Sequence, residues 1–173
     1  GQIISSPIDF TVVIDPIFDG AHEVTPWNGK DTKAVTPNAD GVYEISEASE
    51  LAWLAAAVNG EVAVTKAGEY SFAGEIVRLT EDIDLGNYPW TPIGLTGDKT
   101  GFKGTFDGQG HTISNLYVDL TAEPKYQSAG LFGSAREGEI KNFTVKNAVV
   151  KNITTGSASS CGTAVVVGSA QSN

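Results

Sequence analysis

The chain has 173 residues, of which 40% are apolar, and this is enough to bury the core of one ordinary domain without a cofactor. Its 21 acidic residues against 11 basic ones give a net charge of −10, which disfavours nucleic acid and anionic lipid headgroups as partners. No apolar run approaches the roughly 20 residues that span a bilayer, and the single cysteine, Cys161, excludes an intrachain disulfide and a thiolate metal cluster. The 20 glycines, with many Thr, Val, Asn and Ser residues, favour strands and turns, so we expect an all-β protein.

Residues 1–40 form the first predicted segment. Short apolar stretches such as residues 8–14 alternate there with prolines, which limit regular strand pairing. We expect extended chain with one or two edge strands, lying against a main domain at residues 41–173. Because the chain contains no methionine, we also expect it to be part of a longer protein.

A helix is predicted for residues 46–59, at the start of the main domain. Ser46 offers an N-cap oxygen, and Asn59 followed by glycine supplies a stop. The spacing of the apolar residues places three of them on one face, namely Leu51, Leu54 and Val58. An amphipathic helix just ahead of a strand-rich region commonly covers an open sheet or coil end, so we expect a cap.

Two internal repeats follow the helix. Residues 113–118 (Ile-Ser-Asn-Leu-Tyr-Val) recur 27 positions later as residues 140–145 (Ile-Lys-Asn-Phe-Thr-Val). Residues 129–135 (Ala-Gly-Leu-Phe-Gly-Ser-Ala) recur 35 positions later as residues 164–170 (Ala-Val-Val-Val-Gly-Ser-Ala). Repeats of unequal length are typical of a coil in which the loops vary and the strands stay in register.

The first repeat predicts a parallel β-helix with a specific register. Ile113 and Ile140 would be buried and stacked on neighbouring strands, about 4.8 Å apart. Asn115 and Asn142 would form an amide ladder at a corner, because Asn tolerates the left-handed backbone region. Isolated turn asparagines in an antiparallel sandwich remain the alternative.

Several segments of the chain, in order, resemble the GLUG-containing β-helical surface proteins. The resemblance covers about three-quarters of the chain and rests on residues 50–59 (ELAWLAAAVN), 79–85 (LTEDIDL), 90–94 (WTPIG), 102–116 (FKGTFDGQGHTISNL) and 130–133 (GLFG). It implies a short right-handed, pectin-lyase-like parallel β-helix from a secreted cell-surface protein with a structural or adhesive role. The second copy of the Gly-Leu-Phe-Gly segment lacks its leading glycine and is cut short at Asn173, so we expect a truncated coil.

Acidic residues are the most enzyme-like feature of the sequence. Polysaccharide lyases and hydrolases with this fold use clustered carboxylates, and the candidates are Asp82, Asp84, Asp107 and His111. Asp82 and Asp84, two apart on a strand, would share a face. Each aspartate also has an ordinary use in a tight turn, and we predict that structural role, with no catalytic residue and no enzymatic activity.

Metal sites have weak support. Asp82, Asp84 and Asn87 offer oxygen ligands close together, but nothing resembles a twelve-residue calcium loop. His22 and His111 are too few for zinc, and the adjacent Glu23 lacks the second histidine of a metallopeptidase helix. We predict no metal and no cofactor.

Aromatic residues could form a sugar-stacking surface if several are exposed together. The candidates are Trp27, Tyr70, Tyr88, Trp90, Tyr117 and Tyr126. The family pattern around Trp90 favours core packing instead.

The sequence is therefore interpreted as a non-catalytic structural or adhesion module of an exported bacterial cell-surface protein. A carbohydrate-binding or carbohydrate-active β-helix module is the alternative, because fold does not determine function. The expected partner is a surface protein or glycan of the host or of bacteria, without nucleic acid or membrane insertion. The uncharged, β-branched run at residues 163–167 further predicts self-association through the last rung of the coil.

Overall fold

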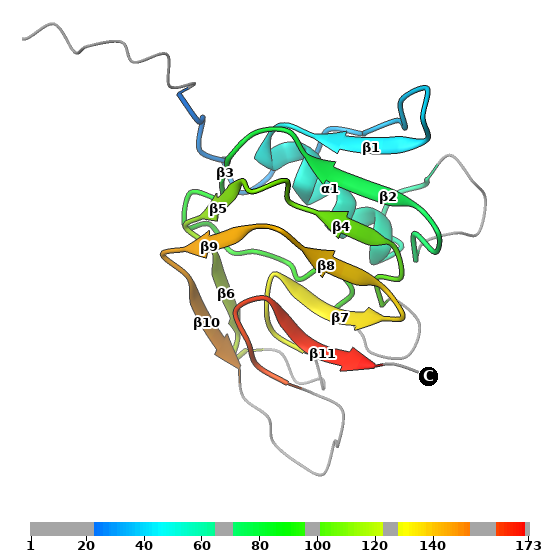
Figure 1. Ribbon diagram of the computed structural model, residues 1–173. Helices are drawn as coiled ribbons and strands as arrows, with labels where there is room; N and C mark the ends of the chain where they lie inside the picture. Colours follow the sequence, from blue (N-terminus) through cyan, green and yellow to red (C-terminus); the bar gives the residue numbers. More distant parts are fainter. Residues whose placement is uncertain (1–22, 65–70, 96–100, 123–127, 153–161, 172–173) are drawn as a thin grey trace, which may run out of the picture.

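The computed structural model describes residues 23–64, 71–95, 101–122, 128–152 and 162–171. Within these ranges the chain is mostly β, with one helix (Figure 1). The elements are β1 (Val42–Ile45), α1 (Ala48–Val58), β2 (Ile76–Leu79), β3 (Ile83–Asp84), β4 (Thr105–Asp107), β5 (Thr112–Ser114), β6 (Tyr117–Leu120), β7 (Phe132–Arg136), β8 (Glu139–Lys141), β9 (Thr144–Lys146), β10 (Val149–Asn152) and β11 (Val167–Gln171).

The strands form four parallel stacks, which are the walls of a coil of about three turns. The first wall has the order β1-β2-β4-β8, the second β3-β5-β9, the third β6-β10 and the fourth β7-β11. Every strand pair is parallel, and the chain passes from wall to wall before it returns one rung further along. The predicted short right-handed parallel β-helix is thus confirmed.

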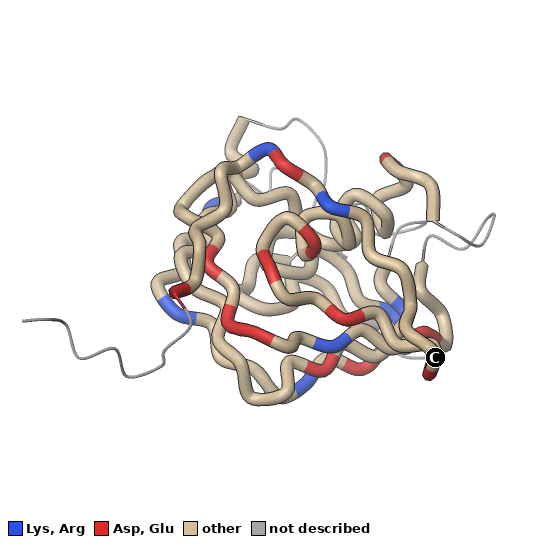
Figure 2. The backbone as a smooth tube through the Cα atoms, turned by 90° about the horizontal axis from the view of Figure 1, so that it is seen from above, with Lys and Arg blue, Asp and Glu red and all other residues tan. Residues whose placement is uncertain are grey.

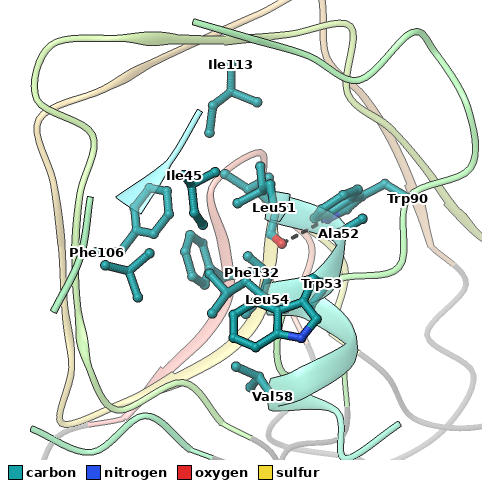
Figure 3. Close-up of a cluster of buried hydrophobic side chains, with 14 of the residues drawn as sticks. Ile45, Leu51, Ala52, Trp53, Leu54, Val58, Trp90, Phe106, Ile113 and Phe132 are labelled. Atoms are coloured by element: carbon teal, nitrogen blue, oxygen red, sulfur yellow. Dashed lines mark hydrogen bonds between the residues drawn. The ribbon is translucent and has the colours of Figure 1, made fainter. Parts of the chain in front are cut away.

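The inside of the coil is apolar because alternate residues of each short strand point inward. In β2, Val77 and Leu79 are buried while Arg78 between them is exposed. Aromatic and aliphatic side chains from successive rungs fill the interior without solvent exposure, among them Phe102, Phe106, Ile113, Leu116 and Phe132. Figure 3 shows several of them enclosed by the backbone, with α1 alongside.

The register predicted from the 27-residue repeat is wrong. Ile113 pairs with Val145, 32 positions later, and Ile140 pairs with Phe106. Ile140 is also only half-buried. The error has a physical reason. An apolar residue, one further residue and then Asn mark a corner of the coil, and the last rung repeats this motif every five residues, at Ile140, Val145 and Val150. The motif identifies a corner without saying which corner.

The 35-residue repeat gives the correct register. Phe132, Ser134 and Ala135 of β7 lie beside Val167, Ser169 and Ala170 of β11. This segment occurs once on each of the two strands of the fourth wall, so its match is unambiguous.

The helix α1 covers the core next to β1, and its predicted apolar face is confirmed, since Leu51, Leu54 and Val58 are all 0% exposed. Its predicted beginning at Ser46 is wrong. The N-cap residue is Glu47, and the Ser46 hydroxyl donates to Glu50 Oε2 at 3.1 Å instead of accepting an amide hydrogen bond. The Glu50 carboxylate reaches back to the amide of Ser46 as well, at 2.8 Å.

The end of α1 follows the prediction. Asn59 is the C-cap, and Gly60 takes a positive φ of 76°, which glycine adopts without a steric penalty. The amides of Gly60 and Glu61 bond back to the carbonyls of Ala57 and Ala56, at 3.1 and 2.8 Å, as in a Schellman motif.

Residues 23–40 carry no regular secondary structure and run along the coil and the helix. The Trp27 amide donates to the Asp84 carbonyl at 2.9 Å, and the Lys33 amide donates to the Ser49 carbonyl at 3.0 Å. The edge strand predicted at residues 8–14 lies outside the described residues. No helix in the described ranges is long and apolar enough to span a membrane.

Candidate functional site

Asp82 lies just ahead of β3, beside the next rung. Its Oδ1 accepts the Thr112 amide at 2.9 Å and lies 3.2 Å from His111 Nδ1. The Thr112 amide, followed by the His111 ring, holds the pKa of Asp82 below its ordinary value. An acid with a lowered pKa stays ionised near neutral pH, which suits a structural acceptor better than a proton donor.

Asp84 begins a ladder that crosses three rungs at one corner. Its Oδ1 accepts the Gly86 amide at 2.8 Å, which closes a local turn, and also accepts Asn115 Nδ2 at 2.8 Å. Asn115 Oδ1 in turn accepts Asn147 Nδ2 at 3.3 Å. Asn115 and Asn147 both have left-handed backbones, with φ of 58° and 53°. The predicted amide ladder therefore exists, but Asn115 pairs with Asn147 and not with Asn142.

Asp107 makes the equivalent contacts at the corner between the first and second walls. Its Oδ1 accepts the Gln109 amide at 3.1 Å and Asn142 Nδ2 at 3.0 Å. Partial burial raises the pKa of Asp107, but the Gln109 amide and the Asn142 amide group outweigh it and the net shift is downward.

Asp119 is a fourth member of this group, which the sequence interpretation missed. Its Oδ1 accepts the Thr121 hydroxyl at 2.6 Å and the Thr121 amide at 3.1 Å, and its Oδ2 accepts the Tyr117 hydroxyl at 2.9 Å. The Thr121 hydroxyl and amide, then the Tyr117 hydroxyl, lower the pKa of Asp119 to about 2. Lys151 of the next rung lies 3.5 Å from Asp119 Oδ2 and 5.2 Å from the centre of the Tyr117 ring. The alternation of Tyr117 and Asp119 on β6 with Thr121 just after it was the available signal.

The aspartates thus occupy separate corners and walls. Asp82 and Asp84 flank the inward-pointing Ile83, as predicted for residues that share the outer face, but each has its own donors. Figure 2 shows acidic and basic residues spread along the backbone and not gathered in one place. No three His, Cys, Asp or Glu side chains within the described ranges gather closely enough to hold a metal ion. His22 and Cys161 lie outside those ranges.

The aromatic candidates separate into core and surface. Trp90 is 3% exposed, and its Nε1 donates to the Leu131 carbonyl at 3.1 Å, as the core interpretation predicted. Trp27 packs edge-on against it at 5.7 Å between ring centres and is half-buried. Tyr88 is 46% exposed. Tyr70 and Tyr126 lie outside the described residues.

A cleft of about 590 Å³ lies between the Trp27 segment and the beginning of α1. Its lining combines an aromatic ring with amide, carboxylate and ammonium groups, contributed by Trp27, Asn28, Asp31, Lys33 and Glu47. Lys33 bridges Glu47 at 3.2 Å and Glu50 at 3.0 Å. These contacts, Glu50 before Glu47, raise the pKa of Lys33, so its ammonium group is already paired within the cleft.

Comparisons with known proteins find a relative that is similar over most of this chain. No protein-family model matches the chain, and no solved structure matches it. The chain is similar to halomucin of Haloquadratum walsbyi (strain DSM 16790 / HBSQ001), with 30% identity over 134 residues. The similar region covers 76% of this chain but only 1% of halomucin. The short right-handed parallel β-helix implied by the GLUG resemblance is present in the structure, whereas the GLUG motif and the pectin-lyase-like family are not shown by these comparisons.

Proposed function

We propose that this chain is a non-catalytic structural module of an exported cell-surface protein, acting as a stiff spacer or adhesion element. The observation that carries the proposal is the use of its acidic residues. Asp84 and Asp107 each close a local turn and accept an asparagine from the following rung. Asp119 closes a turn as well and lies beside a lysine of the following rung. The carboxylates therefore join one rung to the next.

The electrostatics supports a structural use of the same residues. Glycoside cleavage commonly employs two carboxyl groups that face each other across the sugar, one with a raised pKa so that it can donate a proton. Asp82, Asp107 and Asp119 all have lowered pKa values and remain acceptors. Ionised carboxylates that accept hydrogen bonds from turn amides and from neighbouring rungs stabilise a coil and are poorly suited to donate a proton.

The comparison with halomucin is compatible with a place in a surface protein. Adhesion, the GLUG motif and the pectin-lyase-like family belong to the proposal and come from the sequence resemblance. A surface protein or glycan is the partner that we propose. The overall charge of −10 favours neither nucleic acid nor an anionic membrane.

The test of the proposal is an activity screen on the purified chain. Pectin, other acidic glycans and casein should stay intact, with and without calcium. The structural role would be contradicted if the chain turned over one of these substrates, if Asp84→Asn or Asp107→Asn abolished that turnover, and if Asp40→Asn left it unchanged. Asp40 is the matched control because it lies exposed in a turn close to β1.

Carbohydrate binding is a second candidate, favoured by the Trp27 cleft. An aromatic face beside amide and carboxylate groups can stack on a sugar ring while it bonds the hydroxyls. Calorimetric titration with neutral and acidic oligosaccharides would test it. Binding that Trp27→Ala removes and Tyr117→Ala preserves would support the cleft as the site. Tyr117 is the control because it lies on the third wall, against Asp119 and Lys151.

A further inference from the structure

An exposed turn at residues 28–31 holds the Asn28 side chain against its own backbone. Asn28 Oδ1 accepts the amides of Lys30 and Asp31, each at 3.0 Å. Asn28 Nδ2 donates to Asp31 Oδ2 at 2.6 Å. Asn28 is exposed to solvent, and all three hydrogen bonds stay within the turn. Two amides are therefore directed at the carboxamide oxygen of a residue that water reaches.

Gly29, the residue after Asn28, is a glycine for a packing reason. Its φ is 78°, and a Cβ at this position would lie 2.7 Å from carbon atoms of the Tyr88 ring. Because glycine has no side chain, none crowds the Gly29 amide nitrogen from its own residue. Among the hydrogen bonds between described residues, none engages this nitrogen. No described residue therefore restrains it from approaching Cγ of Asn28.

We propose that Asn28 is a site of deamidation driven by its own backbone. The first step forms a bond between Asn28 Cγ and the Gly29 nitrogen, which gives its proton to hydroxide. The negative charge that develops on Oδ1 is stabilised by the two amides of the turn, as in an oxyanion hole. The Cγ–Nδ2 bond then breaks, and Nδ2 leaves as ammonia with a proton from water. Water opens the resulting five-membered imide to aspartate or isoaspartate, so one water is consumed for each ammonia released.

Asn59 also precedes a glycine, but both of its reacting groups are restrained. The Gly60 amide donates to the Ala57 carbonyl at 3.1 Å, at the end of α1. The Asn59 carboxamide makes three hydrogen bonds to the backbone of residues 92–95, at 2.8 to 3.1 Å. Ring closure at Asn59 requires the helix end and this contact to open first, which lowers the fraction of molecules able to react.

Asn38 has a turn like that of Asn28 without the glycine. It is exposed, and its Oδ1 accepts the amides of Asp40 and Val42, at 3.0 and 3.1 Å. The next residue is Ala39, whose methyl group crowds the attacking nitrogen. Asn38 is therefore a matched control for the glycine, because both turns supply two donors to the side-chain oxygen.

Deamidation of Asn28 changes the charge of the Trp27 cleft. It replaces the Nδ2 donor, 2.6 Å from Asp31 Oδ2, by a second carboxylate oxygen. Two carboxylates at this distance repel each other, so the turn opens. Trp27 Nε1 then loses its acceptor, the Asp31 carbonyl at 2.9 Å, and one side of the cleft is loosened. This inference goes beyond the proposed function and does not depend on it.

Peptide mapping by mass spectrometry of the purified 173-residue chain, after incubation at neutral and at mildly alkaline pH, tests the site. Asn28 should deamidate at least about tenfold faster than Asn59 and Asn38. The products should include isoaspartate, which forms through the imide, and the rate should rise with pH because the nitrogen attacks without its proton. Ala39→Gly should raise the rate at Asn38 about tenfold.

Incubation in urea separates promotion by the turn from simple exposure. Unfolding removes the two donors, so deamidation of Asn28 should be slower in urea than in the folded chain by about threefold or more. Asn59 should instead deamidate faster in urea, because its restraints are lost. Faster deamidation of Asn28 in urea than in the folded chain overturns the proposal, and so do rates at Asn28 and Asn59 that agree within about twofold in the folded chain.

Hydrogen exchange of Asn28→Asp tests the effect on the cleft. The amides of residues 25–33 should exchange at least about threefold faster than in the parent chain. Asn38→Asp is the control and should leave them unchanged, and circular dichroism would verify that both variants remain folded. Unchanged exchange of residues 25–33 in Asn28→Asp contradicts the loosening of the cleft.

Discussion

The replacement of Asn115 tests the corner ladder most sharply. Asn115 donates to the Asp84 carboxylate at 2.8 Å and accepts from Asn147 at 3.3 Å, and its φ is 58°. A hydrogen bond to a charged group contributes about 1.5–3 kcal/mol, and the longer one to Asn147 contributes about 0.5 kcal/mol. An ordinary side chain in the left-handed region costs about 1 kcal/mol more than glycine. After a discount for partial exposure, Asn115→Ala should lower the free energy of unfolding by about 2–4 kcal/mol, and Asn115→Gly by about 1 kcal/mol less.

Urea denaturation of the two variants and of a matched control would measure these differences. Asn142→Ala is the control, since Asn142 has the same backbone conformation, with φ of 59°, but is exposed and makes one side-chain bond across rungs, to Asp107. Its bond to Asp107 is exposed and contributes less, so Asn142→Ala should lower the free energy of unfolding by at least about 1 kcal/mol less than Asn115→Ala. Equal losses for Asn115→Ala and Asn142→Ala, or a loss below about 0.5 kcal/mol for Asn115→Ala, would refute the ladder.

Three other predictions follow from the packing and the charges. Leu54→Ala removes a side chain with 0% exposure and should lower the free energy of unfolding by about 2–5 kcal/mol. A loss under about 1 kcal/mol in a urea titration would show that α1 contributes little to the stability of the core. Gly108→Ala would place a Cβ against Phe143 and 2.8 Å from the Asn142 carbonyl oxygen. Its thermal midpoint should fall further than that of Gly110→Ala, where nothing lies within 4 Å and only the positive φ of 88° opposes a side chain. The carboxylates with lowered pKa values, including Asp119 at about 2, stabilise the fold above their unfolded pKa near 4 and lose that contribution as pH falls through the folded values. Thermal midpoints should therefore decline between about pH 4 and pH 2, with a shallower decline for Asp119→Asn, and a flat profile would contradict the assignment.

The fold class and the apolar face of the helix could be predicted from the sequence because both depend on local periodicity. Leu51, Leu54 and Val58 repeat at helical spacing, and the Gly-Ser-Ala segment occurs once on each strand of the fourth wall, so each pattern has one interpretation. The helix N-cap was harder to predict. Ser46 is a good capping residue, but the Glu50 carboxylate competes for it by accepting its hydroxyl and its amide.

Local sequence patterns could not predict which strands pair, because several corners of one rung carry the same residue types. The segment around Asn142 looks like the segment around Asn115, yet it turns the chain from the first wall to the second, while Asn115 turns it from the second to the third. Only the length of each rung distinguishes them, and loops of variable length hide it. The Trp27 cleft was unpredictable for a related reason: residues 25–33 meet the start of α1 through tertiary packing of an irregular segment.

Cysteine cross-linking between neighbouring rungs tests the central claim most directly. Ser114 pairs with Lys146 on adjacent parallel strands, where α-carbons lie about 4.8 Å apart, within the range that a disulfide bridges. In a Cys161→Ser background, Ser114→Cys with Lys146→Cys should form an intrachain disulfide under mild oxidation, detected by mass spectrometry. Ser114→Cys with Lys141→Cys, the pair that the 27-residue register would bring together, should not. Cross-linking of the second pair and not of the first would contradict the coil described.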